Sequence, residues 1–275
     1  MRLEDVNCPC CGANATTPWA TESGYSLVRC TACLLLYVNP RPSMQDISAA
    51  NKLGEHRTEA GTVVVRAHRD ARLVSGFRRL IAELFPDLSG PVRWLDVGAG
   101  YGEMVQAAQS MLPPGSKVQG IEPMTAKTLH AQAAGINVVA TPLSEVGEGH
   151  DVVSLINVFS HIPDFREFGR ELRRVLRPGG TLLLQTGNAA DLPSRSAYPG
   201  ELYLPDHLVF AGEAQMGRIL GDLGFRIEQV HRERLDSPAF VVRSAVKHLL
   251  RGKLLLQLPG TSPFRLVTYR ATRID

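Results

Sequence analysis

The sequence predicts an α/β fold, in which a mostly parallel sheet carries helices on both faces, with a small cysteine-bearing module ahead of it. From Val92 onward, apolar runs of strand length alternate with runs of helix length. All five cysteines fall within the first 33 residues, which indicates one local device instead of scattered core cysteines. The 275 residues, 44% of them apolar, are enough for one large domain and a small appendage.

The first 45 residues are expected to form a zinc-binding module. Two C-x-x-C pairs, Cys8 with Cys11 and Cys30 with Cys33, are spaced as in four-cysteine zinc sites. Four thiolates leave no open coordination position, so the metal is expected to be structural. Two disulfides are the alternative, and iron in place of zinc is left open. Cys10 has the wrong spacing for a ligand and is expected to be a free or neighbouring thiol, although a ligand swap is not excluded by spacing alone.

Residues 46–90 are expected to form a helical linker or lid. The polar run from Ser43 to Thr58 predicts a hinge and a short helix, and a second helix is predicted from Thr62 until Pro86 stops it. One side of that helix is apolar. The other side is basic and is either a solvated face or a contact for an anionic substrate group; it carries Arg66, His68, Arg69, Arg72, Arg78 and Arg79.

A glycine-rich turn follows the strand that ends at Asp96. Gly98, Gly100 and Gly102 allow positive φ angles and let a ligand lie against bare backbone at the start of the next helix. The dinucleotide pattern G-x-G-x-x-G needs a small residue where this chain has Glu103. About twenty residues further on, Glu122 ends a strand, where a carboxylate can bind ribose hydroxyls of either NAD or an adenosyl cofactor.

The downstream order of elements supports one of these two cofactors. A buried strand from Asp151 to Val158 leads to Ser160-His161-Ile162-Pro163-Asp164, a helix, and the strand that starts after Gly180. With the spacing D-x-G-x-G-x-G, this order resembles the class I S-adenosylmethionine-dependent methyltransferases. The resemblance implies a Rossmann-like seven-stranded sheet over residues 91–275, with an antiparallel last strand. It also implies cofactor contacts from Asp96, Gly98, Ala99, Gly100, Gly102, Glu122, Pro123 and Asn157.

The remaining helices and strands are predicted from the capping residues, glycines and prolines that begin or end them. Asp164 is expected to cap its helix, and helices are predicted over 124–134, 212–223 and from Ser237 to Leu250, the last with the basic residues Arg243, Lys247 and Arg251. Strands are predicted over 136–140, 225–231 and 264–272. No acid stands where the resemblance implies a contact to the adenine amine, so a backbone contact or packing by Leu143 is expected there.

The long segment from Ala189 to Phe210 is expected to cover or select the substrate. Two histidines are candidates for removing a proton from the acceptor: His207 first, in Pro-Asp-His-Leu-Val-Phe, and His161 second. The alternative for each is a hydrogen-bonded loop histidine. Tyr198, Tyr203 and Asp206 are expected to contact the substrate.

The cysteine pairs and the following Tyr-Val-Asn-Pro-Arg-Pro resemble the zinc-binding segment ahead of bacterial methyltransferases of sugar, polysaccharide and natural-product pathways. This implies methyl transfer to a sugar, a sugar nucleotide or a natural-product intermediate, with O-methylation favoured. Related sugar C-methyltransferases carry a further large domain, for which no residues remain in this sequence. An RNA methyltransferase and a non-catalytic cofactor-binding scaffold are the alternatives; a net charge of +3 does not establish a polyanionic partner. A soluble, cytoplasmic protein is expected, and the oligomeric state is left open.

Overall fold

The computed structural model describes residues 2–58, 61–64, 69–234 and 262–274. Its centre is a seven-stranded sheet with the order β10-β9-β8-β11-β12-β15-β14. Neighbouring strands from β10 to β12 are parallel, and β15 is antiparallel to both of its neighbours, so the predicted fold class is confirmed. The strands are β8 (Arg93–Val97), β9 (Lys117–Ile121), β10 (Val138–Val139), β11 (His150–Ile156), β12 (Leu176–Gly187), β14 (Phe225–Glu233) and β15 (Leu266–Arg273).

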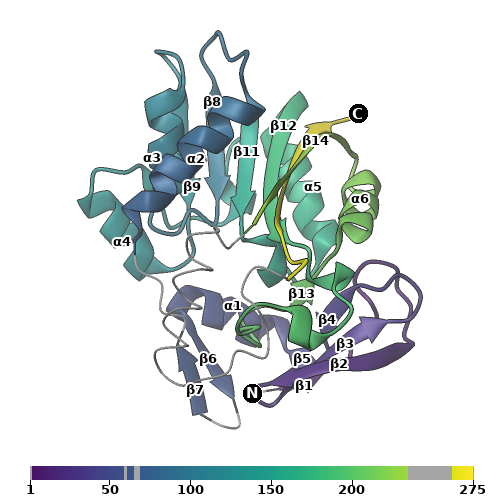
Figure 1. Ribbon diagram of the computed structural model, residues 1–275. Helices are drawn as coiled ribbons and strands as arrows, with labels where there is room; N and C mark the ends of the chain where they lie inside the picture. Colours follow the sequence, from purple (N-terminus) through teal and green to yellow (C-terminus); the bar gives the residue numbers. More distant parts are fainter. Residues whose placement is uncertain (1, 59–60, 65–68, 235–261, 275) are drawn as a thin grey trace, which may run out of the picture.

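Side chains that alternate along the strands give this sheet two apolar faces. Trp94 and Val152 belong to the cluster that includes α2 and α3, whereas Leu95 and Val153 belong to the cluster that includes α5 and α6. Figure 1 shows the helices on both faces. The α-helices are α1 (Met44–Leu53), α2 (Ala71–Leu84), α3 (Glu103–Met111), α4 (Thr125–Ala133), α5 (Phe165–Val175) and α6 (Glu213–Asp222), and the 3₁₀ turns are η1 (Leu143–Glu145), η2 (Phe159–His161), η3 (Ala189–Asp191) and η4 (Arg195–Ala197).

The N-terminal residues form a second, four-stranded sheet that borrows a strand from the rest of the chain. Its order is β13-β4-β3-β2, and β13 (Val209–Phe210) pairs antiparallel with β4 (Leu36–Val38). The other two strands are β2 (Thr16–Glu22) and β3 (Tyr25–Cys30), while β1 (Leu3–Glu4) pairs with β5 (Arg41–Pro42). In Figure 1 these strands lie beyond the end of the large sheet toward which β8 and β11 point.

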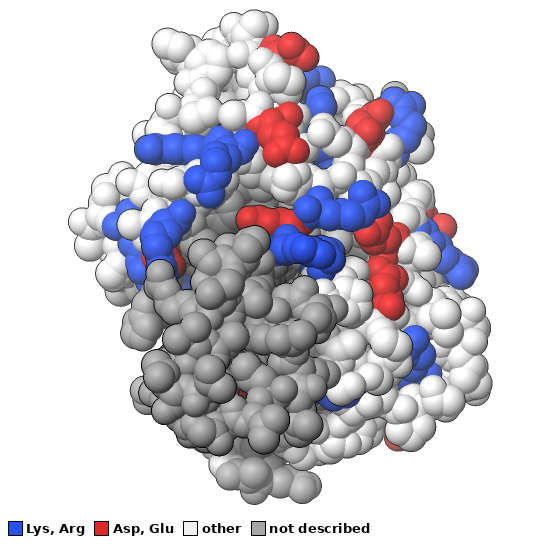
Figure 2. All heavy atoms as spheres, viewed as in Figure 1, with Lys and Arg blue, Asp and Glu red and all other residues white. Residues whose placement is uncertain are grey.

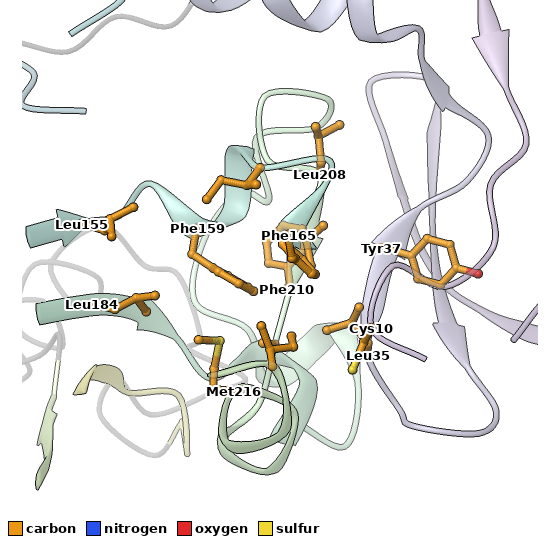
Figure 3. Close-up of a cluster of buried hydrophobic side chains, with 14 of the residues drawn as sticks. Cys10, Leu35, Tyr37, Leu155, Phe159, Phe165, Leu184, Leu208, Phe210 and Met216 are labelled. Atoms are coloured by element: carbon orange, nitrogen blue, oxygen red, sulfur yellow. The ribbon is translucent and has the colours of Figure 1, made fainter. Parts of the chain in front are cut away.

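One apolar core joins the two sheets. Leu35 and Cys10 of the N-terminal part belong to the same buried cluster as Phe210, Met216 and Leu184. In Figure 3, Phe165, Phe210 and Met216 lie between Leu35 and Cys10 on one side and Leu155 and Leu184 of the large sheet on the other. The N-terminal part is therefore packed against the end of the large sheet through side chains that exclude water.

The region before β8 differs from the predicted helix. A hairpin of β6 (Glu55–Thr58) and β7 (Gly61–Val64) occupies its first part, and the helix begins only at Ala71. The run Thr-Val-Val-Val from position 62 consists of β-branched residues, which favour strands. The Asp70 carboxylate accepts a hydrogen bond from the Arg72 amide and caps the helix.

Elsewhere the predicted elements agree with the structure within a few residues, except that β12 begins at Leu176 and not after Gly180. Asp164 caps α5 by accepting hydrogen bonds from two amides. The predicted helix from Ser237 to Leu250, with Arg243, Lys247 and Arg251, lies outside the described residues, as do Arg66 and His68. Within the described part of the chain, none of the helices has the length and apolar character needed to cross a membrane.

Candidate active site

The turn after β8 has the backbone that its glycines predict. Gly98, Gly100 and Gly102 have φ angles of 70°, 55° and 82°. A Cβ on Gly98 would collide with Val158, and one on Gly102 would lie 2.6 Å from Ile136 Cγ2, whereas nothing lies near a Cβ on Gly100. Packing therefore requires two of the glycines, and the third leaves open backbone at the edge of a cavity.

Glu122 links this turn to the end of β9. Its side chain is buried, and its Oε2 accepts a hydrogen bond of 2.8 Å from the Gly100 amide. The Oε1 atom accepts a bond of 2.9 Å from the Met124 amide. A carboxylate has about four acceptor positions, so two remain for the hydroxyls of a ligand.

Asp96 ends β8 in full burial. The Ser154 hydroxyl donates a hydrogen bond of 2.5 Å to its Oδ1, and the Trp94 indole donates one of 2.9 Å to the same hydroxyl. Burial raises the pKa of Asp96 to about 7, although the bond from Ser154 acts to lower it. Residues of β8 and β11 therefore position the carboxylate. Its pKa is sensitive to any charge placed next to it.

A cavity of about 1340 Å³ opens at the carboxyl ends of the parallel strands. Ligands of open α/β sheets bind at this edge. Of the predicted cofactor residues, all but Gly102 line the cavity; Gly102 instead starts α3. All five predicted catalytic and substrate residues line it as well: His161, Tyr198, Tyr203, Asp206 and His207.

The two histidines and Asp206 form one cluster in this cavity. The Nδ1 atom of His161 lies 2.9 Å from the backbone oxygen of Asp206 and 3.2 Å from its Oδ1. These acceptors assign the proton to Nδ1 and leave Nε2 able to take up a proton. The His161 and His207 rings meet edge to face, with centroids 4.8 Å apart.

The surroundings move the pKa values of the two histidines in opposite directions. Burial acts to lower the pKa of His161, but the hydrogen bond and charge of Asp206 raise it above its ordinary value. Burial, with His161 close by, lowers the pKa of His207 to about 4. The Nδ1 of His207 is buried and has no hydrogen-bond partner among the described residues. His207 is therefore neutral at pH 7, and His161 is the stronger base.

Two cavity residues hold an uncommon backbone conformation. Asn157 has a φ angle of 57° and Tyr203 one of 61°. Asparagine tolerates this left-handed region, whereas a bulky tyrosine adopts it rarely, and such residues concentrate at functional sites. Tyr203 is also 54% exposed, which is uncommon for an aromatic ring in a structured segment.

The N-terminal part holds the segment that carries Asp206 and His207. The Glu22 carboxylate accepts hydrogen bonds from the amides of Leu202, at 2.9 Å, and Leu204, at 3.3 Å. The Val38 amide of β4 donates to the Leu208 carbonyl at 2.8 Å. These hydrogen bonds lie before and after His207 in the sequence and therefore hold its segment against the N-terminal sheet.

Sequence reasoning missed three residues that shape the cavity. Phe210 and Phe264 line it together with Tyr198, although they come from distant parts of the chain, and Glu22 holds its outer segment. No local motif marks them, because only tertiary packing brings them together. Leu143, predicted to pack there, is buried and lines the cavity.

Four cysteine sulfurs converge in the N-terminal part. Cys8 Sγ lies 3.4 Å from Cys33 Sγ, and Cys11 Sγ lies 3.6 Å from Cys30 Sγ. All four ligand atoms lie within 4.8 Å of one another. A tetrahedral site with zinc–sulfur bonds near 2.3 Å separates its sulfurs by about 3.7 Å, and a disulfide needs about 2.05 Å. The arrangement fits a tetrahedral ion, and Cys10 lies outside it.

Comparison with known proteins identifies the family of the chain. Residues 66–230 match the family model described as "Methyltransferase domain". A stretch of 104 residues is 34% identical to the ubiquinone biosynthesis O-methyltransferase of Sodalis glossinidius, covering 34% of this chain and 41% of that protein. The corresponding protein of Cereibacter sphaeroides is 30% identical over 125 residues, which is 40% of this chain and 49% of that protein. The matches thus span less than half the length of these curated relatives.

Among solved structures, the fold is similar to that of the geranyl diphosphate C-methyltransferase from Streptomyces coelicolor A3(2). The TM-score is 0.54 at 16% sequence identity, and the alignment covers 74% of this chain and 80% of that one. That structure was determined with Mg²⁺, geranyl diphosphate and S-adenosyl-L-homocysteine. At this identity the likeness concerns the fold.

Proposed function

The chain belongs to the methyltransferase-domain family and has the class I fold, and from this premise we propose that it transfers a methyl group from S-adenosylmethionine to a small-molecule hydroxyl. The observation that carries the proposal is the shared cavity. It joins the open backbone at Gly100 and the carboxylate of Glu122 to the cluster of His161, Asp206 and His207. Cofactor and acceptor sites must meet in this way for direct transfer.

The residues present suit an adenosyl cofactor better than a dinucleotide. Glu122 has two acceptor positions left for ribose hydroxyls, and Gly100 has no side chain to block the ligand. Glu103 begins α3, lines the cavity, and accepts a hydrogen bond of 3.1 Å from the Asp70 amide. A carboxylate at this helix start repels a pyrophosphate, which NAD would place there.

The bound cofactor supplies an electron-poor methyl carbon, and the protein must orient the acceptor oxygen and remove its proton. We assign proton removal to His161, because Asp206 fixes its tautomer and raises its pKa. His207, which the sequence ranked first, is kept neutral by burial and is suited to a hydrogen bond with the acceptor. This order of roles suits an oxygen acceptor, which must lose its proton as it is methylated, whereas a neutral amine nitrogen can attack through its lone pair before it loses one.

The acceptor class remains the one that the sequence suggests: a sugar, a sugar nucleotide or a natural-product intermediate. The described part of the face in Figure 2 does not support the RNA alternative. In the view of Figure 2, acidic and basic side chains are interspersed over the described part of that face. A protein that binds the phosphate backbone of RNA instead has Lys and Arg side chains clustered in one continuous stripe or patch.

We also propose that the four cysteines bind one structural zinc ion, supported by the sulfur separations and by the spacing of the two pairs. On this basis residues 1–45 are a zinc-binding module, residues 46–90 a linker over the cavity and residues 91–275 the cofactor-binding domain. The shared core and the β13–β4 pairing make these parts interdependent.

Calorimetry with S-adenosylmethionine and with NAD tests the cofactor assignment. We expect saturable binding of S-adenosylmethionine, with one site per chain, and at least tenfold weaker binding of NAD, corresponding to about 1.4 kcal/mol. Preferential binding of NAD would contradict the proposal. Incubation with labelled S-adenosylmethionine and pooled hydroxylated compounds then distinguishes an enzyme from a binding scaffold.

A further inference from the structure

A continuous series of rings lines the acceptor side of the cavity. Phe264 meets Tyr198 with centroids 5.0 Å apart, and Tyr198 meets Phe210 at 6.1 Å. Phe210 meets His207 at 5.8 Å, and His207 meets His161 at 4.8 Å. The three aromatic side chains, Tyr198, Phe210 and Phe264, are called the aromatic wall below. It leads directly to the pair of histidines.

The aromatic wall is built from three separate segments and is held in place. Phe210 belongs to β13 and is fixed by its pairing with β4, and the Arg195 guanidinium covers the Tyr198 ring at 5.6 Å from its centroid. A Cβ on Gly187 would lie 2.5 Å from Phe264 Cζ, so the glycine leaves the space that the ring occupies. The rings are therefore positioned before any acceptor binds.

Such a wall suits a flat, apolar ligand. Aromatic rings attract other rings through edge-to-face or offset contacts and contribute large apolar area. A sugar instead presents hydroxyls on most of its surface, each of which needs a hydrogen-bond partner when it is buried. The wall provides one such group, the Tyr198 hydroxyl, and two rings without any.

The cavity also has room for such a molecule beside the cofactor. Its volume of about 1340 Å³ exceeds the roughly 300–1,000 Å³ typical of a site for one small ligand. Phe77 of α2 and Phe168 of α5 line it as well. The acceptor can therefore be larger than a single ring.

We propose that the acceptor is an aromatic molecule with a phenolic hydroxyl, bound with its ring against Tyr198, Phe210 and Phe264 and its oxygen toward the two histidines. This inference rests on the proposed methyl transfer. In the step, the phenol oxygen gives its proton to Nε2 of His161 and bonds to the methyl carbon. The carbon–sulfur bond breaks with its electron pair on sulfur, which leaves an aryl methyl ether and S-adenosylhomocysteine.

The acidity of a phenol matches the base that the protein offers. A phenol has a pKa near 10, as in tyrosine, whereas an aliphatic hydroxyl has a considerably higher pKa and is a weaker acid. Histidine titrates near neutrality, and Asp206 raises the pKa of His161. The proton transfer is therefore much less uphill for a phenol than for a sugar hydroxyl.

Binding of two probes to the protein saturated with S-adenosylhomocysteine tests the inference without knowledge of the natural acceptor. The probes are 4-nitrophenol, whose absorbance reports its ionisation, and uridine diphosphate glucose. We expect 4-nitrophenol to bind at least tenfold more tightly than the sugar nucleotide and to ionise at lower pH when bound than when free. Tighter binding of uridine diphosphate glucose would overturn the inference.

A pair of variants isolates the ring. Tyr198→Phe keeps the ring and should bind 4-nitrophenol like the wild type, whereas Tyr198→Leu should bind it about five- to tenfold more weakly. Unchanged binding in Tyr198→Leu would count against the aromatic wall. Affinity for S-adenosylhomocysteine shows that each variant is folded; if Tyr198→Leu loses it, Phe264→Leu takes its place.

The two proposals fail in different ways. Wild-type protein that does not bind S-adenosylhomocysteine contradicts the proposed function and the inference together. Protein that binds S-adenosylhomocysteine and prefers the sugar nucleotide contradicts only the inference and leaves methyl transfer standing.

Discussion

At the scale of single residues, the carboxylate of Glu122 accepts hydrogen bonds from two amides around the glycine turn, and in the proposed complex its remaining acceptor positions bind the ribose. We predict that Glu122→Gln weakens binding of S-adenosylmethionine about tenfold, because charge-assisted hydrogen bonds become neutral ones. Calorimetry measures the change. Glu145→Gln is the matched control, since Glu145 is exposed, lies outside the cavity and bonds the Thr141 hydroxyl. Equal losses in both variants would refute this role.

The depressed pKa of His207 makes stability depend on pH. Its folded pKa of about 4 lies below the ordinary 6.5, so its contribution is present above pH 6.5 and is lost as the pH falls toward 4. His161 acts with the opposite sign, because its pKa is raised. We predict that the wild type loses about 2 kcal/mol more than His207→Gln between pH 6.5 and 4, allowing for partial exposure.

Urea unfolding at pH 6.5, 5 and 4 gives the comparison. The difference between the two curves reports the titration of His207 together with its coupling to His161. Parallel curves would mean that the imidazole is not buried in the way the structure places it.

At this scale the sequence was informative where chemistry needs a local pattern. Three glycines at alternate positions, followed by Glu122, predicted a cofactor site, and of these residues Gly98, Gly100 and Glu122 line one cavity. It was uninformative for Phe210 and Phe264, because their meeting depends on where β13 and β15 pair. The proposed roles reverse the predicted order of His207 and His161, because the effect of Asp206 on the imidazole of His161 depends on a tertiary contact that the sequence does not show.

At the scale of elements, substitutions at two helical glycines separate the effect of side-chain packing on stability from the effect of helix propensity. A Cβ on Gly169 of α5 would collide with Leu223, whereas nothing lies within 4 Å of one on Gly217 of α6. We predict that Gly217→Ala stabilises the protein by about 0.5–1 kcal/mol, through helix propensity and reduced freedom of the unfolded chain. Gly169→Ala should destabilise it by about 1–2 kcal/mol because overpacking outweighs the same gain. Denaturant midpoints of both variants check the signs.

Helices and strands were predicted best where the spacing of apolar residues and the residues that begin or end an element indicate the same structure. The strands of the large sheet and α5, with its Asp164 cap, were placed correctly because buried strands and capped helices have local signatures. The hairpin of β6 and β7 was missed because apolar residues near position 62 also fit a helical period. Their β-branched character was the available signal, and pairing between the two strands decided the outcome.

At the scale of the whole molecule, the cysteine cluster and the cavity are connected, because Cys8 and Cys30 belong to the same buried core as the cavity residues Phe210 and Phe264. The Gln215 amide donates a hydrogen bond of 2.7 Å to the Cys33 carbonyl, which ties α6 to the second cysteine pair. We predict about one zinc ion per chain, and that chelation lowers the free energy of unfolding by at least about 3 kcal/mol. Hydrogen exchange should accelerate at Val38, whose amide donates to the Leu208 carbonyl, and at Phe210, which pairs with Leu36, because the pairing of β4 with β13 loses its support. Elemental analysis and exchange measurements follow both effects.

Two cysteine variants provide the control for metal loss. Cys10→Ser should retain the metal, because Cys10 lies outside the four-sulfur cluster, whereas Cys30→Ser should lose it. A folded Cys30→Ser protein with a full equivalent of zinc would contradict the four-thiolate site.

The borrowed strand has a consequence for synthesis on the ribosome. The first three strands of the N-terminal sheet leave the exit tunnel early, but β13, at residues 209–210, is translated much later. Until then the outer edge of β4 has no neighbour, and exposed edges invite pairing with other chains. The nascent protein must therefore keep that edge shielded while most of the polypeptide is still being made.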